Sequence, residues 1–197
     1  LSHSEKYYPA DTAANDYKTA LDISNPDNRV GFGDSADVYK LTMTSAGALT
    51  LVLTGLSGNA DLSLLNSAGT VLKSSAKAGT ADEAISNILL LAGIYYVKVA
   101  AGSGVNDAGY TLSDSIKYYP ADTAANDYKT AQDISNPDSG VGFGDTADVY
   151  KLTMSNAGTL TLGLTGLSGN ADLSLLNSTG GVLKTSAKAG TADEAIS

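Results

Sequence analysis

Apolar and polar residues alternate along short stretches of this chain. The alternation is clearest at two sets of three positions: Tyr39, Leu41 and Met43, then Leu49, Leu51 and Leu53. A period of two places one side of a strand against a core, so these stretches predict half-buried antiparallel strands. Turns rich in Gly, Asn and Ser separate further predicted strands at residues 60–65, 70–74, 84–91, 94–99 and 109–113. About seven short strands of this kind predict an all-β, antiparallel, jelly-roll-like β-sandwich.

The longest apolar run extends from Ile88 to Val97 and ends at Lys98. A helix that spans a bilayer needs about twenty apolar residues, so we expect no membrane span. The run instead predicts a pair of buried strands. Residues 11–20 begin with Asp and contain several Ala, but we expect mostly irregular backbone there, with one helical turn at most.

The whole pattern occurs twice. Residues 112–197 repeat residues 1–86 at an offset of 111, and only 13 of the 86 aligned positions differ. We therefore predict a complete domain at residues 1–111 and a C-terminally incomplete one at residues 112–197. The repeat is much longer than the units of solenoids, so each copy should fold by itself. Any site on which the protein depends should also appear twice.

Two interpretations of the incomplete copy remain open. It lacks the equivalent of residues 87–111, which would leave sheet edges without partners. Another chain could supply strands by complementation or swapping, or the sequence could be a section of a longer tandem array. Both interpretations make neighbouring copies of the same repeat the expected partners.

The composition argues against some classes of function and favours others. The net charge is −9 and the 12 Lys and Arg residues are scattered, which argues against nucleic acid as a partner. The chain has no cysteine, and Gly, Ala, Ser, Thr, Asn and Asp dominate it. This composition is typical of exported bacterial surface proteins, so we expect a secreted or cell-surface location. The acidity is compatible with divalent cations or with simple solvation.

Motifs for covalent catalysis in the first copy are not reproduced in the second copy. The one histidine, His3, becomes Asp114 in the second copy, so a Ser-His-Asp triad is not expected. Ser74 and Lys77 have the spacing of a serine–lysine motif, but the serine becomes Thr185. We expect no enzyme activity from this chain.

Paired tyrosines occur at residues 7–8, 95–96 and 118–119. They could form a binding face for carbohydrate or protein. Adjacent residues of a strand point to opposite faces, however, so core packing of one tyrosine in each pair is the favoured interpretation.

A family resemblance rests on several spaced motifs. GFGDSADVYKL at residues 31–41 is followed by AGALTLVLTGL, NADLSLLNSAGTVL, AGIYYVKV and GYTLS. The combination resembles the bacterial pre-peptidase C-terminal domain family and covers a whole unit. The resemblance implies a jelly-roll-like β-sandwich that serves secreted proteases, collagenases and surface proteins as a non-catalytic accessory or binding module.

The same resemblance implies a calcium site. In collagen-binding members of the family, calcium is held by an acidic segment near the domain start and by two aspartates spaced D-x-x-D before a strand. Calcium takes six to eight oxygen ligands, so both elements are needed. The ligands implied in the first copy are Asp11, Asn15, Asp16, Asp34 and Asp37, and those in the second copy are Asp122, Asn126, Asp127, Asp145 and Asp148. Alternatively, Asp34 and Asp37 cap a loop through Asx turns.

Two functions are consistent with these observations. The first is a non-enzymatic extracellular structural module of a tandem-repeat fibre, stalk or adhesin, stabilised by Ca²⁺. It is favoured because loops such as residues 55–60 are almost unchanged between the copies, whereas loops that bind different ligands would diverge. The second is an accessory domain that tethers a secreted hydrolase to extracellular matrix collagen or polysaccharide.

Overall fold

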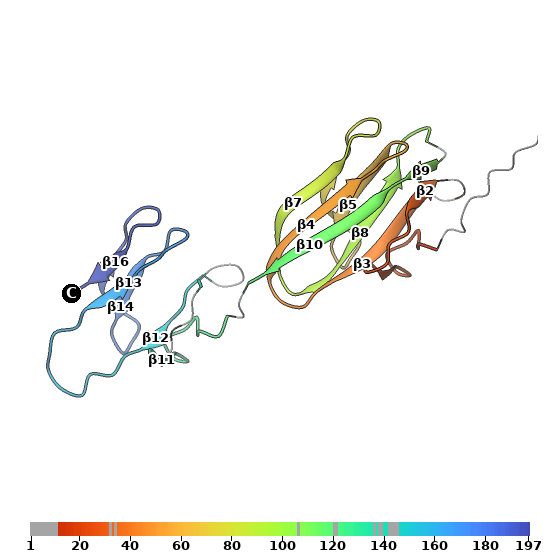
Figure 1. Cartoon of the computed structure of the whole chain (residues 1–197). Helices are drawn as coiled ribbons and strands as arrows, with labels where there is room; N and C mark the ends of the chain where they lie inside the picture. The colour runs from red at the N-terminus through yellow and green to blue at the C-terminus, as the bar shows by residue number, and fades with distance from the viewer. Residues whose placement is uncertain are drawn as a thin grey trace, which may run out of the picture. The chain divides into compact units, whose positions relative to one another are not determined.

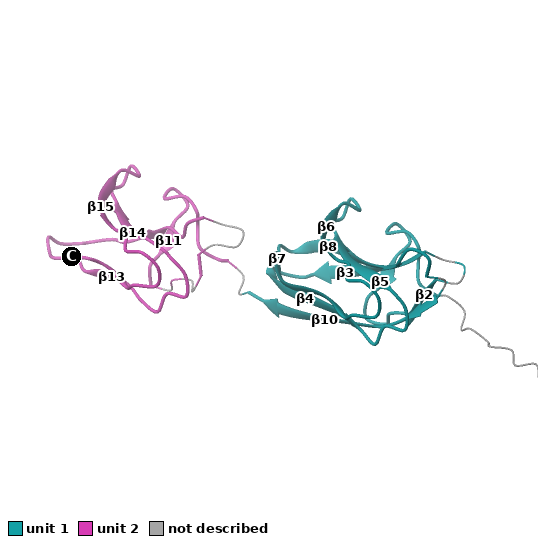
Figure 2. Ribbon diagram, turned by 90° about the horizontal axis from the view of Figure 1, so that it is seen from above, with its two compact units in different colours: residues 1–119 teal, residues 120–197 magenta. Residues whose placement is uncertain are grey.

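The protein forms two compact units, residues 1–119 and residues 120–197, in a computed structural model (Figure 2). The structure describes residues 12–31, 33, 35–105, 107–119, 122–135, 137, 140–141 and 146–197. All regular elements among these residues are strands, so the predicted all-β class is confirmed. No described helix is long and apolar enough to cross a membrane.

The first unit contains ten strands (Figure 1). They are β1 (Leu21–Asp22), β2 (Arg29–Gly31), β3 (Ala36–Met43), β4 (Gly47–Thr54), β5 (Ala60–Leu65), β6 (Val71–Ser75), β7 (Glu83–Leu90), β8 (Gly93–Ala101), β9 (Asp107–Gly109) and β10 (Thr111–Tyr118).

The described residues of the second unit form six strands. They are β11 (Gln132–Asp133), β12 (Tyr150–Lys151), β13 (Leu162–Leu164), β14 (Leu173–Leu176), β15 (Val182–Ser186) and β16 (Glu194–Ile196).

Two sheets make up the sandwich of the first unit. One has the strand order β1-β3-β8-β5-β6 and the other has the order β10-β4-β7. The pairs within the sheets are antiparallel except for β1 with β3, which is parallel. The strands β2 and β9 form a small antiparallel pair of their own. Because β7 and β8 belong to different sheets, the turn between them carries the chain from one layer to the other.

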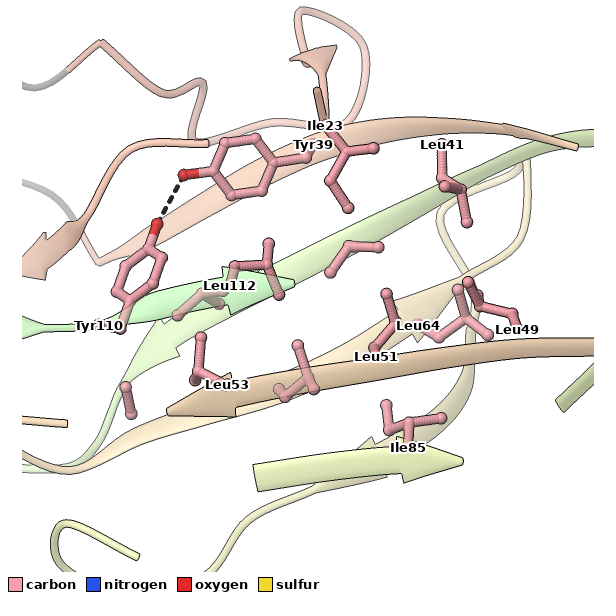
Figure 3. Close-up of a cluster of buried hydrophobic side chains, with 14 of the residues drawn as sticks. Ile23, Tyr39, Leu41, Leu49, Leu51, Leu53, Leu64, Ile85, Tyr110 and Leu112 are labelled. Atoms are coloured by element: carbon pink, nitrogen blue, oxygen red, sulfur yellow. Dashed lines mark hydrogen bonds between the residues drawn. The ribbon is translucent and has the colours of Figure 1, made fainter. Parts of the chain in front are cut away.

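The core lies between the two sheets and uses the predicted alternation. Leu49, Leu51 and Leu53 of β4 are completely buried, and so are Leu62 and Leu64 of β5. Figure 3 shows four of them, Leu49, Leu51, Leu53 and Leu64, between the layers. The predicted strand at residues 60–65 coincides with β5, and those at 70–74, 84–91 and 94–99 differ from β6, β7 and β8 by one or two residues at either end.

The compact unit and the sequence repeat begin at different places. The second sequence copy starts at Leu112, yet residues 111–118 form β10, which pairs with β4 of the first unit over eight residues. Unit 2 begins only at Pro120. The predicted strand at residues 109–113 is therefore wrong in its bounds, because β9 ends at Gly109 and β10 continues to Tyr118.

The apolar run at residues 88–97 is only partly buried, contrary to expectation. Leu90 and Val97 are buried, but Leu89, Leu91 and Ile94 are 53%, 54% and 45% exposed. Each sheet has one face against the core, so consecutive apolar residues cannot all be covered. The run is indeed a strand pair, but one that leaves an apolar turn at the surface.

The tyrosine pairs behave differently from one another. Tyr95 packs against the core, whereas Tyr96 makes an edge-to-face contact with Tyr17, at 5.4 Å between ring centroids. This pair confirms the expected division between two faces. Tyr118 is 43% exposed and its neighbour Tyr119 is half-buried, so core packing is wrong for that pair. Residues 7–8 lie outside the described part of the chain.

The segment at residues 12–20 runs irregularly, as expected, and packs beside β3 and the turn between β5 and β6. Ala14 bridges to Val38, and the ring of Tyr17 lies where a side chain on Gly69 would be, at 2.7 Å from its Cβ position. Gly69 has a φ of 79°. The second unit reproduces the contact between Tyr128 and Gly180, again at 2.7 Å. A glycine is needed at this turn for both its backbone conformation and its lack of a side chain.

Candidate functional site

Asp37 is the central residue of the predicted metal set, and the structure buries it completely. It is the second residue of β3 and lies in phase with the inward-facing Tyr39. Its carboxylate accepts a hydrogen bond of 2.5 Å from the phenol of Tyr110, which is 3% exposed. Hydrogen bonds to a charged acceptor are among the stronger ones, so Asp37 holds β3 to the start of β10.

The hydrogen bonds around Asp37 have one consistent direction. Each phenol has a single proton, and Tyr110 donates its own to Asp37. In the 2.6 Å contact between the two phenols, Tyr39 must therefore donate to Tyr110 (Figure 3). The oxygen of Tyr39 in turn accepts from the backbone N–H of Asp27, at 3.0 Å. Burial raises the pKa of both Tyr39 and Tyr110 above the usual value, so both phenols remain protonated.

Further hydrogen bonds and an ion pair lie beside this network. Asp27 accepts hydrogen bonds from the N–H and hydroxyl of Thr12, both at 3.1 Å. Arg29 forms an ion pair with Asp107, with 2.7 Å between Nε and Oδ1. The amide of Tyr110 donates to the carbonyl of Asn28 at 2.8 Å. The network and these links join segments at both ends of the first unit.

The other predicted ligands lie close by in the chain but are exposed. The antiparallel bridge between Ala14 and Val38 makes Asn15 and Asp37 neighbours of the bridged residues. Asn15 and Asp16 are solvent-exposed, and Asp16 accepts the backbone N–H of Lys18 at 3.0 Å as an Asx turn. Asp11 and Asp34 lie outside the described residues.

The second unit repeats this local arrangement. Ala125 bridges to Val149, beside Asn126, and Asp127 accepts the N–H of Lys129 at 3.0 Å. Asp148, the counterpart of Asp37, is half-buried. The remaining predicted ligand in the described part, Asp122, is exposed and accepts the N–H of Ala124. Asp145 lies outside the described residues.

The described residues do not by themselves make a calcium site. No group of three acidic or other metal-binding side chains comes together among them. Asn15, Asp16 and Asp37 provide fewer oxygens than calcium takes, and Asp37 already accepts the Tyr110 phenol. Calcium therefore stays a prediction that requires Asp11 and Asp34 to complete the set.

A second buried carboxylate was not among the predicted residues. Glu83 begins β7 and is completely buried. It accepts hydrogen bonds from the hydroxyl of Ser75 and from the backbone N–H of Lys77, the latter at 2.6 Å. The strands β6 and β7 are edge strands of different sheets. Glu83 therefore links an edge of one sheet to an edge of the other.

The same carboxylate link occurs in the second unit. Glu194 is 1% exposed and accepts the hydroxyl of Ser186 and the N–H of Lys188. The hydrogen bond from Ser186 lowers the pKa of Glu194 below its usual value. The sequence held a signal for this residue type, because Glu83 is in phase with the inward-facing Ile85 and recurs after the repeat offset.

Fold and site together define an antiparallel β-sandwich domain that contains buried, hydrogen-bonded carboxylates in its first unit. Residues 35–101 match the family described as the bacterial pre-peptidase C-terminal domain. The expected resemblance is confirmed over this part of the first unit.

One solved structure with a related title is the pre-peptidase C-terminal domain of collagenase from Bacillus anthracis. It is 21% identical, with a TM-score of 0.38, and the match covers 49% of this chain and 90% of that chain. No curated protein matches the chain.

Proposed function

We propose that the chain is a non-catalytic structural module of a secreted bacterial surface protein, in which β-sandwich units follow one another in a fibre, stalk or adhesin. The strand β10 carries the proposal. It is encoded by the start of the second sequence copy but completes the sheet of the first unit, and the second unit begins at Pro120. The strand that completes the first unit is thus encoded directly before the residues of the second unit, as expected of units that follow one another in an array.

Deleting one repeat from the complete gene tests this function. If the units build a fibre or stalk, electron microscopy of the bacterial surface should show an appendage shortened by one unit, and antibodies against the chain should label intact cells. Deletion of residues 9–119 removes one repeat length of 111 residues and ends where the first unit ends. Unchanged surface structures, or labelling only after cell lysis, would contradict the proposal.

The family description favours a second function. The description of the matched family, bacterial pre-peptidase C-terminal domain, refers to peptidases. On this alternative, the chain is an accessory domain that holds a secreted hydrolase on collagen or polysaccharide. Co-sedimentation of the purified chain with collagen fibrils and with insoluble polysaccharides distinguishes the two functions. Saturable binding to one of these supports the accessory domain, whereas the structural module requires none.

We also propose that calcium stabilises each unit by holding the segment at residues 11–16 against the strand that contains Asp37. The bridge between Ala14 and Val38 supports this because it already places that segment beside β3. Adding calcium to a chelator-treated sample should raise the melting temperature, and Asp34→Asn combined with Asp145→Asn, its counterpart in the second copy, should abolish the increase. Asp114→Asn, on the exposed side of β10, is the control and should preserve it. An unchanged melting temperature in the native chain would contradict calcium binding.

A further inference from the structure

One end of the first unit is apolar at its surface. Leu89, Leu91 and Ile94, in and beside the turn between β7 and β8, are 53%, 54% and 45% exposed. Leu89 lies between two residues that pack against the core, so it points to the outer face of its sheet. Ile94 lies opposite the exposed Thr42 on the outer face of the other sheet. The three side chains, called the apolar tip below, therefore flank the turn on both sides of the sandwich.

Tyrosine and lysine side chains lie at the same end. Tyr118 of β10 and Leu90 of β7 are both opposite the first residue of β4, so β10 ends beside the apolar tip. Tyr118 is 43% exposed, and the preceding Lys117 is exposed as well. Tyr95 is half-buried, and its hydroxyl donates a hydrogen bond of 3.2 Å to the carbonyl of Leu91. This bond holds the turn to β8.

This end of the acidic chain is not itself acidic. Four segments form it, at residues 44–46, 66–70, 91–92 and 116–119. Lys117 is the one charged residue in them, and the adjoining Asp16 and Lys18 have opposite charges. Asp82 and Glu83 lie at the other end, beyond an eight-residue strand that spans about 27 Å. Physiological salt screens charges beyond about 8 Å, so the net charge of −9 does not act at the apolar tip.

The size of the apolar tip argues against a second copy of the chain as its partner. Three half-exposed aliphatic side chains amount to about 300 Å², whereas a stable protein interface buries about 800 Å² on each partner. A lipid bilayer imposes no such minimum, because each apolar group that leaves water contributes in proportion to its area. The bilayer surface also favours tyrosine and lysine, which remain among the headgroups while aliphatic side chains lie deeper.

We propose that the apolar tip of the first unit binds a lipid membrane surface. Leu89, Leu91 and Ile94 enter the boundary between headgroups and acyl chains, Tyr118 lies at the level of the headgroups, and Lys117 reaches the lipid phosphates. The backbone of the turn stays at the interface, where water satisfies its polar groups. Binding by one unit is weak and reversible, since it depends on three side chains. It requires neither the structural array nor the accessory role proposed above.

A vesicle-binding experiment tests the proposal. The intact chain is mixed with phosphatidylcholine vesicles at physiological salt, and the bound fraction is measured by flotation at increasing lipid concentration. Leu91→Asp should lower the partition coefficient about tenfold or more, because it replaces an inserted side chain by a charge. Leu21→Asp is the matched control and should leave the coefficient within about twofold. Leu21 is 59% exposed, but it belongs to β1, which is two strands away from β8 in the sheet.

A fluorescent label distinguishes insertion of the apolar tip from adhesion of another surface. The chain has no cysteine, so Leu91→Cys and Leu21→Cys each provide one site for an environment-sensitive dye. Vesicles should shift the emission of the dye at residue 91 to shorter wavelengths and leave that of the dye at residue 21 unchanged. Circular dichroism without lipid checks that each variant is folded. Flotation of the native chain tests the proposal even if a variant does not fold.

Three results would overturn the proposal: no flotation of the native chain, equal losses for the two aspartate variants, or an emission shift at residue 21 as large as that at residue 91. A dye at residue 91 that is already shielded from water in dilute, lipid-free solution would overturn it as well. In that case protein covers the apolar tip, and a dependence of the shielding on protein concentration would identify a second copy of the chain as the cover.

Discussion

Removing the hydroxyl of Tyr110 is the sharpest test of how the first unit is held together. Tyr110→Phe takes away the hydrogen bond that Asp37 accepts at 2.5 Å, and it also removes the acceptor for the hydroxyl of Tyr39. Both partners are buried, so water cannot replace the lost bonds. The ring itself remains, which restricts the perturbation to one oxygen atom.

The expected loss of stability follows from the two bonds. A hydrogen bond to a charged group contributes about 1.5–3 kcal/mol, and a neutral one contributes about 1 kcal/mol. Tyr110→Phe should therefore lower the free energy of unfolding by about 3 kcal/mol. For a unit of this size, such a loss corresponds to a melting temperature lower by roughly 10 °C.

Urea unfolding followed by circular dichroism, together with calorimetry, measures the effect. Tyr39→Phe should cost about 2 kcal/mol, because it removes the neutral bonds to Tyr110 and from the Asp27 N–H while the bond between Tyr110 and Asp37 survives. The double variant should lose less than the sum of the single losses, since both variants break the bond between the two phenols. Tyr118→Phe, at an exposed position of β10, is the control. A change below about 0.5 kcal/mol for Tyr110→Phe would refute the reasoning.

Three further predictions concern other contacts. The folded pKa of Glu194 is lowered from 4.5, so its stabilisation is present above that unfolded value and is lost as the pH falls below it; the protection of amides at residues 188–194, taken relative to their intrinsic exchange rates at each pH, should decrease below about pH 4.5, and Glu194→Gln should remove this dependence. Gly69→Ala should lower the unfolding free energy by more than about 1 kcal/mol, because the new methyl meets Tyr17 at a positive φ; a neutral result by urea unfolding contradicts this. Arg29→Gly introduces the residue of the second copy and breaks the partly exposed pair with Asp107, so a cost near 1 kcal/mol is expected, and high salt should reduce the difference between the two proteins.

The alternation of apolar residues predicted most of the fold. It located β5 without error and placed β6, β7 and β8 within two residues, because inward-facing positions of a strand must be apolar wherever one face is covered. It failed at the run that contains Leu89 and Leu91, where an uninterrupted apolar sequence has no period to show which residues are exposed. The alternation also contained Asp37 and Glu83 at inward positions, although their partners could not be deduced from it.

The predicted set of ligands contains Asp37, which the structure buries on β3, and calcium binding there stays a prediction. The D-x-x-D spacing drew attention to Asp37, but the sequence contained nothing that paired it with a tyrosine 73 residues away. The spacing of residues along the sequence indicates which of them share a strand. A hydrogen bond between distant segments depends instead on the order of strands in the sheets.

The sequence by itself determined that the chain repeats, because residues 112–197 match residues 1–86, and that its elements are strands, because apolar residues alternate with polar ones. Only the tertiary structure decided that β10, at the start of the second copy, completes the first unit, and that Asp37 is a buried acceptor for Tyr110. It also showed that Leu152 and Met154, identical in sequence to core residues, are exposed in the second unit. The physical reason is that the burial of a residue depends on the strands that pack beside its own strand. The local sequence does not specify which strands these are.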